Sequence, residues 1–296
     1  MEERAESIRV FRPQSLSTLL KVYNRNPRAL LFAGGTEIMP HLRDGGKSGP
    51  SLREGILCLG QVRELARIFR YPRVLDIGAC LPIARILEAG RYILSPLLLE
   101  ALQAIGNPAV RNLATLGGNI CSRSPLADSL PALSVLEAQL ELRSLAGSRW
   151  LKLRQFFAVP GSGALNPGEL VTRIRIPLES WDFQLFRKVS GRITPGRSLV
   201  SCAAAARLGK GALEAFRLSL GGVGNPLFRS PALEAQLEGS RLPVPARAVE
   251  ALVSELDKTL RPLLEGRIRA RYTLETALRL LRWCLERLNE KSLETL

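Results

Sequence analysis

The sequence has only five cysteines and one histidine, and the cysteines are scattered along the chain. No two of its five cysteines stand at the C-x-x-C spacing that zinc and iron–sulfur sites need. The single histidine, His41, excludes an H-E-x-x-H zinc helix, and a catalytic role would require an orienting carboxylate that the sequence alone does not identify. An odd, scattered set of cysteines indicates reduced thiols in the cytoplasm rather than a disulfide framework. The chain itself is therefore not expected to hold a metal ion or cluster.

Aromatic residues and long apolar runs are also scarce. With nine Phe, four Tyr and three Trp, the chain shows no basic patch with the stacking aromatics that single-stranded nucleic acid requires. No run approaches the roughly eighteen apolar residues of a membrane span. Residues Met1 to Ala5 do not lead into the apolar core of a signal peptide. We therefore expect a cytoplasmic protein with no nucleic-acid partner and no membrane span.

Positive charge is in excess. Lys and Arg number 42 against 27 for Asp and Glu, a net charge of +15, and the arginines are spread along the whole chain. Such a balance favours anionic partners, among them nucleic acid, a membrane surface, an acidic protein face or a phosphate-bearing ligand. An ordinary solvated basic surface explains the charge equally well.

The 296 residues, 46% of them hydrophobic, suffice for one large domain or two ordinary ones. The first 170 or so residues alternate short strand and helix patterns, with strands expected at Ala29–Ala33, Gly55–Leu59 and Val74–Ile77. Apolar residues at helical spacing predict helical segments after the second and third of these strands. Val62, Leu65, Ala66 and Phe69 follow the second strand. After the third strand come a short helix opened by Pro82, then Leu98, Leu102 and Ile105, and finally Leu130 to Ala138.

The pattern of predicted strands and helices changes after the turn residues Asn166-Pro167-Gly168. Two long strands are expected at Leu199–Leu208 and Ala212–Leu220, joined by a turn at Gly209-Lys210-Gly211. A final helix follows, with one apolar face formed by Leu274, Leu278, Leu281, Leu285 and Leu288. We place a domain boundary within residues 165–180.

A glycine-rich loop follows the first predicted strand. Two adjacent glycines let main-chain N–H groups approach an anion closely, and a hydroxyl residue adds a donor, so a diphosphate would fit. A Gly-Gly turn after a strand is also a common plain turn, and the spacing differs from a Rossmann loop. The segment comprises Leu31, Phe32, Ala33, Gly34, Gly35, Thr36, Glu37 and Ile38.

A second loop of the same kind follows about eighty residues later. It again combines a hydroxyl, two glycines and an amide, in the residues Thr115, Leu116, Gly117, Gly118 and Asn119. Asp128 comes nine residues further on and could accept hydrogen bonds from sugar hydroxyls. It could equally cap the helix that begins near Leu130.

These loops, taken together, resemble the FAD-binding subunit or domain of the xanthine dehydrogenase and aerobic carbon monoxide dehydrogenase family of molybdenum hydroxylases. The motifs appear in order: Ala33-Gly34-Gly35-Thr36-Glu37, Val110-Arg111-Asn112 with Thr115 to Ile120, and Ser124-Pro125-Leu126-Ala127-Asp128. Further matches cover nearly the whole chain, from Phe11-Arg12-Pro13 through Glu169–Pro177 and Lys188 to Arg192, and on to Leu220-Gly221-Gly222-Val223 with Arg229 and Glu234.

The resemblance implies an α+β fold, with a two-subdomain FAD-binding domain at 1–175 and a carbon monoxide dehydrogenase flavoprotein-like C-terminal domain at 176–296. It implies that both glycine loops clasp the FAD diphosphate, and that Ile105, Asp128, Val171 and Lys188 also contact the cofactor. No side chain is expected to act as acid or base, because the flavin supplies the chemistry.

The same resemblance implies partners. A large subunit would hold the molybdenum cofactor, and a small subunit would carry two [2Fe–2S] clusters that deliver electrons to this FAD, with NAD as the usual acceptor. Where the family usually has an aspartate, this chain has Ser198, after a two-residue insertion through Ile193 to Arg197. That departure leaves NAD, quinone and oxygen open as final acceptors.

Two other functions are compatible with the residues. One is a stand-alone FAD-dependent oxidoreductase with its own substrate pocket. The other is a flavin-free assembly or binding module, which the positive charge favours and the intact glycine loops oppose. Retained flavin separates the last from the others, and co-purification with molybdenum and iron–sulfur subunits separates the relay subunit from a stand-alone enzyme.

Overall fold

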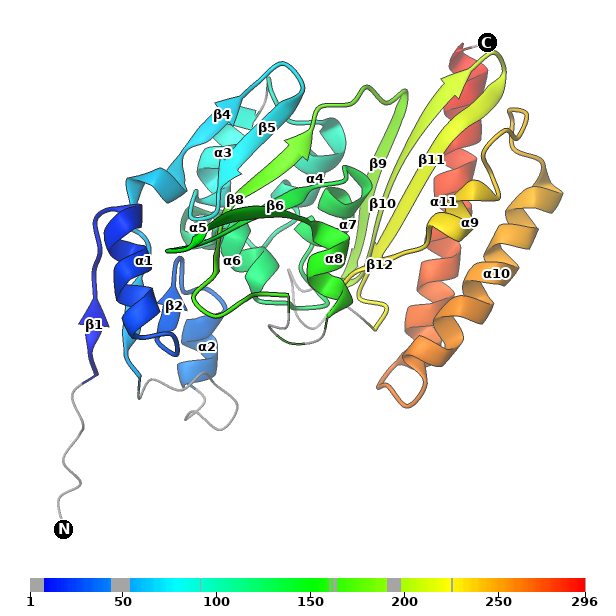
Figure 1. The fold of residues 1–296 in the computed structure, drawn as a ribbon. Helices are drawn as coiled ribbons and strands as arrows, with labels where there is room; N and C mark the ends of the chain where they lie inside the picture. Colours follow the sequence, from blue (N-terminus) through cyan, green and yellow to red (C-terminus); the bar gives the residue numbers. More distant parts are fainter. Residues whose placement is uncertain are drawn as a thin grey trace. The chain divides into compact units, whose positions relative to one another are not determined.

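The computed structural model describes residues 8–43, 54–90, 92–159, 161, 164–190, 198–224 and 226–295. The chain forms two compact units, each assembled from separate stretches of sequence (Figure 1). The first unit comprises Met1–Glu88, Pro108–Ser122 and Gln139–Arg175. The second comprises Ala89–Asn107, Arg123–Ala138 and Ile176–Leu296.

The first unit begins with a small parallel sheet in the order β1-β3-β2. Its strands are β1 (Val10–Phe11), β2 (Leu30–Phe32) and β3 (Ile56–Cys58), and its helices are α1 (Leu16–Arg25) and α2 (Ile38–Arg43). The Ser15 side chain caps α1 by accepting a hydrogen bond from the Thr18 N–H. Apolar residues from α1 and the strands, such as Leu19 and Leu57, share one core cluster. The strands predicted around residues 30 and 57 are confirmed.

The first unit also contains a five-stranded sheet in the order β4-β5-β8-β6-β7. The strands are β4 (Ile68–Arg70), β5 (Val74–Gly78), β6 (Gln139–Ser144), β7 (Gly147–Lys152) and β8 (Leu170–Pro177). The helices that accompany this sheet in the first unit are α3 (Ile83–Gly90), α5 (Pro108–Leu113), α6 (Leu116–Cys121) and α8 (Leu153–Ala158).

The helical spacing from Val62 to Phe69 predicts a helix, and this prediction is wrong for the segment. A single 3₁₀ turn, η1 (Arg63–Ala66), covers its first half, and Phe69 lies in strand β4 opposite Asp76. The Arg67 carbonyl accepts a hydrogen bond from the Gly78 N–H, so the chain leaves the turn to pair with β5. Pairing between distant residues overrides a helical spacing this short.

The second unit is built on an antiparallel sheet in the order β12-β11-β10-β9. Its strands are β9 (Phe183–Ser190), β10 (Ser198–Gly209), β11 (Ala212–Gly221) and β12 (Phe228–Arg229). Strands β10 and β11 form the predicted hairpin, with Gly209 paired to Ala212. Lys210 and Gly211 both have positive φ, as such a two-residue turn requires.

Helices cover both faces of this sheet (Figure 1). Helices α10 (Ala246–Leu264) and α11 (Ala270–Thr295) cover one face, and α4 (Pro96–Gln103) and α7 (Ser129–Val135) cover the other. The short α9 (Pro231–Ala235) contacts β11 and α10. The predicted leucine stripe of α11 is confirmed as core, since Leu274, Leu281, Leu285 and Leu288 are buried and Leu278 is half-buried. The C-terminal segment therefore supplies helices to one face only, and earlier segments cover the other.

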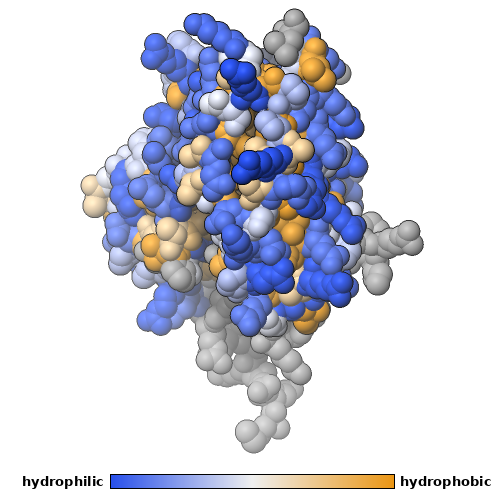
Figure 2. Space-filling model, turned by 90° about the vertical axis from the view of Figure 1, so that its right-hand side faces the viewer, coloured by the Kyte–Doolittle hydropathy of each residue, from blue (hydrophilic) through white to orange (hydrophobic). Residues whose placement is uncertain are grey.

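The outer face of α10 and α11 is mixed in character. Figure 2 presents a surface covered mostly by hydrophilic side chains, with narrow strips of hydrophobic side chains between them. No helix in the described part of the chain is both long and apolar enough to span a bilayer.

Candidate functional site

The first glycine loop joins β2 to α2. Leu31 and Phe32 end the strand, Ile38 opens the helix, and Ala33 to Glu37 connect them. Gly35 has a φ of 71°, and a Cβ there would lie 2.4 Å from the ring of Phe32, so glycine is required.

Main-chain donors in this loop remain open to a ligand. Among the residues that the structure describes, none accepts a hydrogen bond from the N–H groups of Gly34, Gly35 or Thr36. Glu37 is exposed beside them. In the part of the chain that the structure describes, these three successive N–H groups have no internal partner, and such a group of donors can bind an oxyanion.

The second glycine loop begins helix α6, and Thr115 is its N-cap. The Thr115 hydroxyl accepts a hydrogen bond from the Gly118 N–H at 3.1 Å, and its carbonyl accepts one from the Asn119 N–H at 2.9 Å. The Gly117 N–H donates to the Ala79 carbonyl at 2.9 Å. These three amides are bonded within the chain, so this loop offers a ligand close approach at the exposed Gly118 rather than a set of unused donors.

Gly34 packs the first loop against the main chain directly before the second loop. A Cβ on Gly34 would lie 1.9 Å from the carbonyl oxygen of Leu113 and 3.1 Å from the Cα of Ala114. Main chain therefore packs directly on main chain, which only glycine allows. The Ala114 carbonyl is held from its other side by the Ile83 N–H at 2.9 Å. Two segments about eighty residues apart in sequence thus form one cradle, which an added β-carbon would fill.

Three further predicted residues gather in the second unit. The Lys188 ammonium donates to Asp128 Oδ2 at 2.6 Å and to the carbonyl of Ala104 at 2.8 Å, next to the buried Ile105. Asp128 stands at the N-cap position of α7, yet its side chain makes no capping hydrogen bond. Its carboxylate binds Lys188 instead, so the two charges offset each other and join the ends of α4 and α7 to β9.

The remaining predicted residues are core positions. Val171 is buried in β8 opposite Leu142 of β6, and Leu116 is fully buried in α6. The insertion from Ile193 to Arg197 lies outside the described residues, as do Gly191 and Arg192.

Cys80, beside Ala79, is buried, and burial followed by the nearby Cys121 raises the pKa of its thiol to about 12. The thiol form of Cys80 therefore predominates at neutral pH, as is typical of a buried cysteine in the core.

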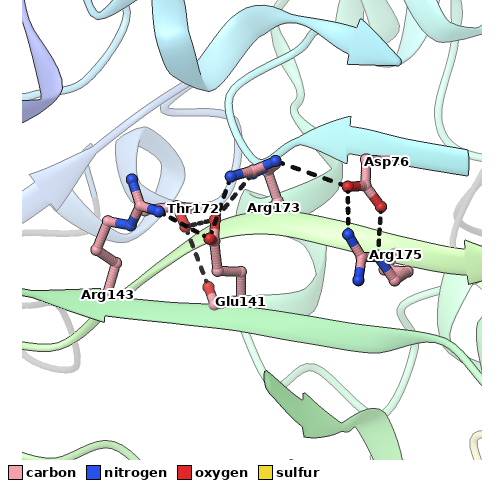
Figure 3. Close-up of polar contacts among 6 residues, drawn as sticks. All are labelled: Asp76, Glu141, Arg143, Thr172, Arg173 and Arg175. Carbon is pink, nitrogen blue, oxygen red and sulfur yellow. Dashed lines mark hydrogen bonds and ion pairs between the residues drawn. The ribbon is translucent and has the colours of Figure 1, made fainter. Parts of the chain in front are cut away.

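An ion network on the five-stranded sheet was not predicted (Figure 3). Asp76 of β5 receives two hydrogen bonds from Arg175 of β8, at 2.7 and 2.8 Å, and these raise the pKa of the Arg175 guanidinium. That guanidinium also lies 4.0 Å from the ring centroid of Trp150. Glu141 of β6 binds Arg173 of β8. The signal that could have revealed the network is charge inside strand patterns, above all the alternating arginines of β8.

Within the described ranges, no group of three or more His, Cys, Asp or Glu side chains lies close enough to hold a metal ion.

Two family models match the chain. Residues 6–179 match the FAD binding domain in molybdopterin dehydrogenase, and residues 186–288 match the CO dehydrogenase flavoprotein C-terminal domain. The chain belongs to this flavoprotein family.

Curated relatives of this flavoprotein subunit include separate chains and parts of longer ones. It is 32% identical to the glyceraldehyde dehydrogenase medium chain of Sulfolobus acidocaldarius, over 78% of this chain and 81% of that one. It is 28% identical to the xanthine dehydrogenase FAD-binding subunit of Escherichia coli O157:H7, over 71% and 72%. It is 29% identical to aldehyde oxidase 2 of Cavia porcellus, over 77% of this chain but 18% of that protein.

Solved structures share the fold. The flavoprotein subunit superposes on a chain of reconstituted CO dehydrogenase from Oligotropha carboxidovorans with a TM-score of 0.84 and 24% identity, covering 98% of this chain and all of the other. A chain of quinoline 2-oxidoreductase from Pseudomonas putida 86 gives 0.81 at 22% identity, covering 98% and 99%. The predicted fold, the FAD cofactor and the oxidoreductase class are thereby confirmed.

Proposed function

We propose that this chain is the electron-relay subunit of a molybdenum hydroxylase. It binds FAD, receives electrons from the [2Fe–2S] clusters of a small partner subunit, and passes them to NAD or another acceptor, while a large partner subunit holds the molybdenum cofactor. The relatives support this division of labour. The chain spans most of a protein named as a medium chain, but less than a fifth of aldehyde oxidase 2.

The observation that carries the proposal is the contact of Gly34 with Leu113 and Ala114, directly before the second glycine loop. In this proposal the N–H groups of Gly34, Gly35 and Thr36 donate to the FAD diphosphate, and the exposed Gly118 lets the phosphates approach the start of α6. The Thr115 hydroxyl fixes the first turn of α6 by accepting from the Gly118 N–H, which keeps that surface open. Residues Leu31 to Ile38 and Thr115 to Asn119 form the two walls.

Ile105, Asp128, Val171 and Lys188 complete the proposed set of cofactor contacts. The charges of Lys188 and Asp128 offset each other. In this proposal the pair therefore holds Ile105 and the ends of α4 and α7 in place. Bound FAD supplies the redox chemistry, because its ring system takes up electrons singly and gives them up in pairs. The protein positions the ring and limits the access of water.

The test uses the chain purified together with its natural partners. Molybdenum, iron and FAD are quantified, and the reduced complex is then mixed anaerobically with NAD, a quinone or oxygen while flavin absorbance is followed. The proposal expects stoichiometric molybdenum and iron, with rapid reoxidation by one acceptor. A chain that purifies alone with FAD and turns over an added substrate without partners would contradict the relay function and favour a stand-alone oxidoreductase.

A further inference from the structure

Two buried polar side chains meet on the five-stranded sheet without touching the glycine loops (Figure 3). Glu141 Oε2 accepts a hydrogen bond from the Thr172 hydroxyl at 2.6 Å and from Arg173 Nε at 2.9 Å. Glu141 is 3% exposed and Thr172 is 1% exposed. A carboxylate so buried is stable only while its partners stay in place, so this short hydrogen bond holds the Thr172 side chain firmly.

A chain of hydrogen bonds leads from Thr172 to the second glycine loop. The Thr172 carbonyl accepts from the Ala79 N–H at 3.0 Å, and the Ala79 carbonyl accepts from the Gly117 N–H at 2.9 Å. Gly117 packs closely on Ala79, since an added Cβ there would lie 2.6 Å from the Ala79 oxygen. Threonine is stiff about its Cα–Cβ bond, so holding its hydroxyl also restrains the Cα of Thr172, next to the carbonyl that Ala79 contacts.

We infer that Glu141 and Thr172 are positioning residues that set the second glycine loop at the place where it meets the FAD diphosphate. Neither residue contacts the cofactor in this scheme, and both act through Ala79 and Gly117. The inference rests on the proposed placement of FAD at the glycine loops. It assigns to the buried carboxylate a role in cofactor affinity as well as in the stability of the sheet.

The test compares Thr172→Val with Thr172→Ser in the full chain. Valine keeps the shape and removes the hydroxyl, whereas serine keeps the hydroxyl. We expect the dissociation constant for FAD to rise about tenfold in Thr172→Val, equivalent to about 1.4 kcal/mol. ADP, which carries the same diphosphate, should lose affinity by the same factor, and Thr172→Ser should restore both.

Glu169→Gln is the matched control. Glu169 is also a buried carboxylate in the first unit and binds Arg149 at 2.8 and 2.7 Å. In the described residues no hydrogen bond leads from its side chain to Ala79. We expect Glu169→Gln to lower the melting temperature as Thr172→Val does, but to leave the affinities for FAD and ADP unchanged within about twofold.

The outcomes separate this inference from the site on which it rests. The inference is overturned if FAD affinity is unchanged in Thr172→Val, or if Thr172→Val and Glu169→Gln lose the same affinity. Loss of FAD binding in Gly118→Asp would in that case still support the proposed FAD site. Full FAD affinity in Gly118→Asp would instead overturn the site. If Thr172→Val does not fold, Glu141→Gln replaces it under the same criteria, because it keeps the side-chain shape and weakens the charge-assisted hydrogen bond.

Discussion

Gly34 lies where two main-chain segments touch, and the α-hydrogen in the position of a β-carbon faces the Leu113 carbonyl. Replacing Gly34 with Ala places a methyl group 1.9 Å from that oxygen, so the two loops must separate. We expect Gly34→Ala to lower the free energy of unfolding by about 1–3 kcal/mol, as overpacking does elsewhere, and to weaken FAD binding. Chemical denaturation and FAD titration measure the two effects.

Gly60→Ala is the comparison for that variant, because nothing lies within 4 Å of the added β-carbon. It should leave both the unfolding free energy and the affinity for FAD near the parent values. A Gly34→Ala protein with the stability of Gly60→Ala would show that the loops do not touch as described.

The sequence revealed the residue types of the site but not the task of each one. Both glycine loops, Asp128 and Lys188 could be named from motifs. The motifs did not show that Gly34 seats one loop on the other, that Gly117 packs on Ala79, or that Lys188 binds Asp128. Each of these tasks depends on which distant segment lies opposite.

At the scale of elements, the five-stranded sheet is held by charges as well as by apolar packing. Asp76 is completely buried, and Arg175 supplies its two short hydrogen bonds. Arg175→Met leaves that carboxylate with the more distant Arg173, 3.6 Å away, so we expect a loss of about 3 kcal/mol in the free energy of unfolding. Urea denaturation of the variant measures it.

The control for Arg175→Met is Arg85→Met. Arg85 pairs with Glu88 on α3, and both side chains are largely exposed, so its removal should cost less than about 1 kcal/mol. Equal losses in the two variants would contradict the special role of Arg175 as the partner of the buried Asp76 carboxylate.

The Arg149–Glu169 pair joins β7 to the residue before β8 and gives the sheet a dependence on pH. Hydrogen bonds from Arg149 are the main cause that lowers the pKa of Glu169. A lowered folded-state pKa contributes stability that is fully present above the ordinary glutamate pKa of about 4.3 and is lost as pH falls through the lower, folded-state value.

The stability difference between the parent protein and Glu169→Gln should therefore be largest near about pH 7 and should shrink below about pH 4. Urea denaturation at the two pH values measures it. A difference that grows on acidification would mean that the pair does not hold Glu169 ionised.

Strands and turns with strong local signals were predictable. The Gly209-Lys210-Gly211 turn and the leucine face of α11 are set by residues close together in sequence. The structure of Val62 to Phe69 and the ion pairs of the alternating arginines in β8 were not predictable, because both depend on the order of the strands in the sheet. Arg173 and Arg175 find carboxylates only because β8 lies between β5 and β6.

At the scale of the whole molecule, neither compact unit is one continuous stretch of sequence. Residues 89–107 and 123–138 belong to the second unit, although they precede the predicted boundary. Helices α4 and α7 carry apolar faces that could pack on either sheet, so local pattern could not assign them. The division into domains at 1–175 and 176–296 stays a prediction, and the two family models meet between residues 179 and 186.

The central claim is that the FAD diphosphate lies against the two glycine loops of the first unit. Its most direct test is an FAD titration of the parent protein, Gly118→Ala and Gly118→Asp. Both variants place the same β-carbon 2.9 Å from the Thr115 hydroxyl, so they differ in the carboxylate alone. We predict that Gly118→Ala binds FAD within about tenfold of the parent and that Gly118→Asp loses at least about a hundredfold, because its charge would face the phosphates. Equal affinities in the two folded variants would contradict the claim and require FAD to bind elsewhere on the chain.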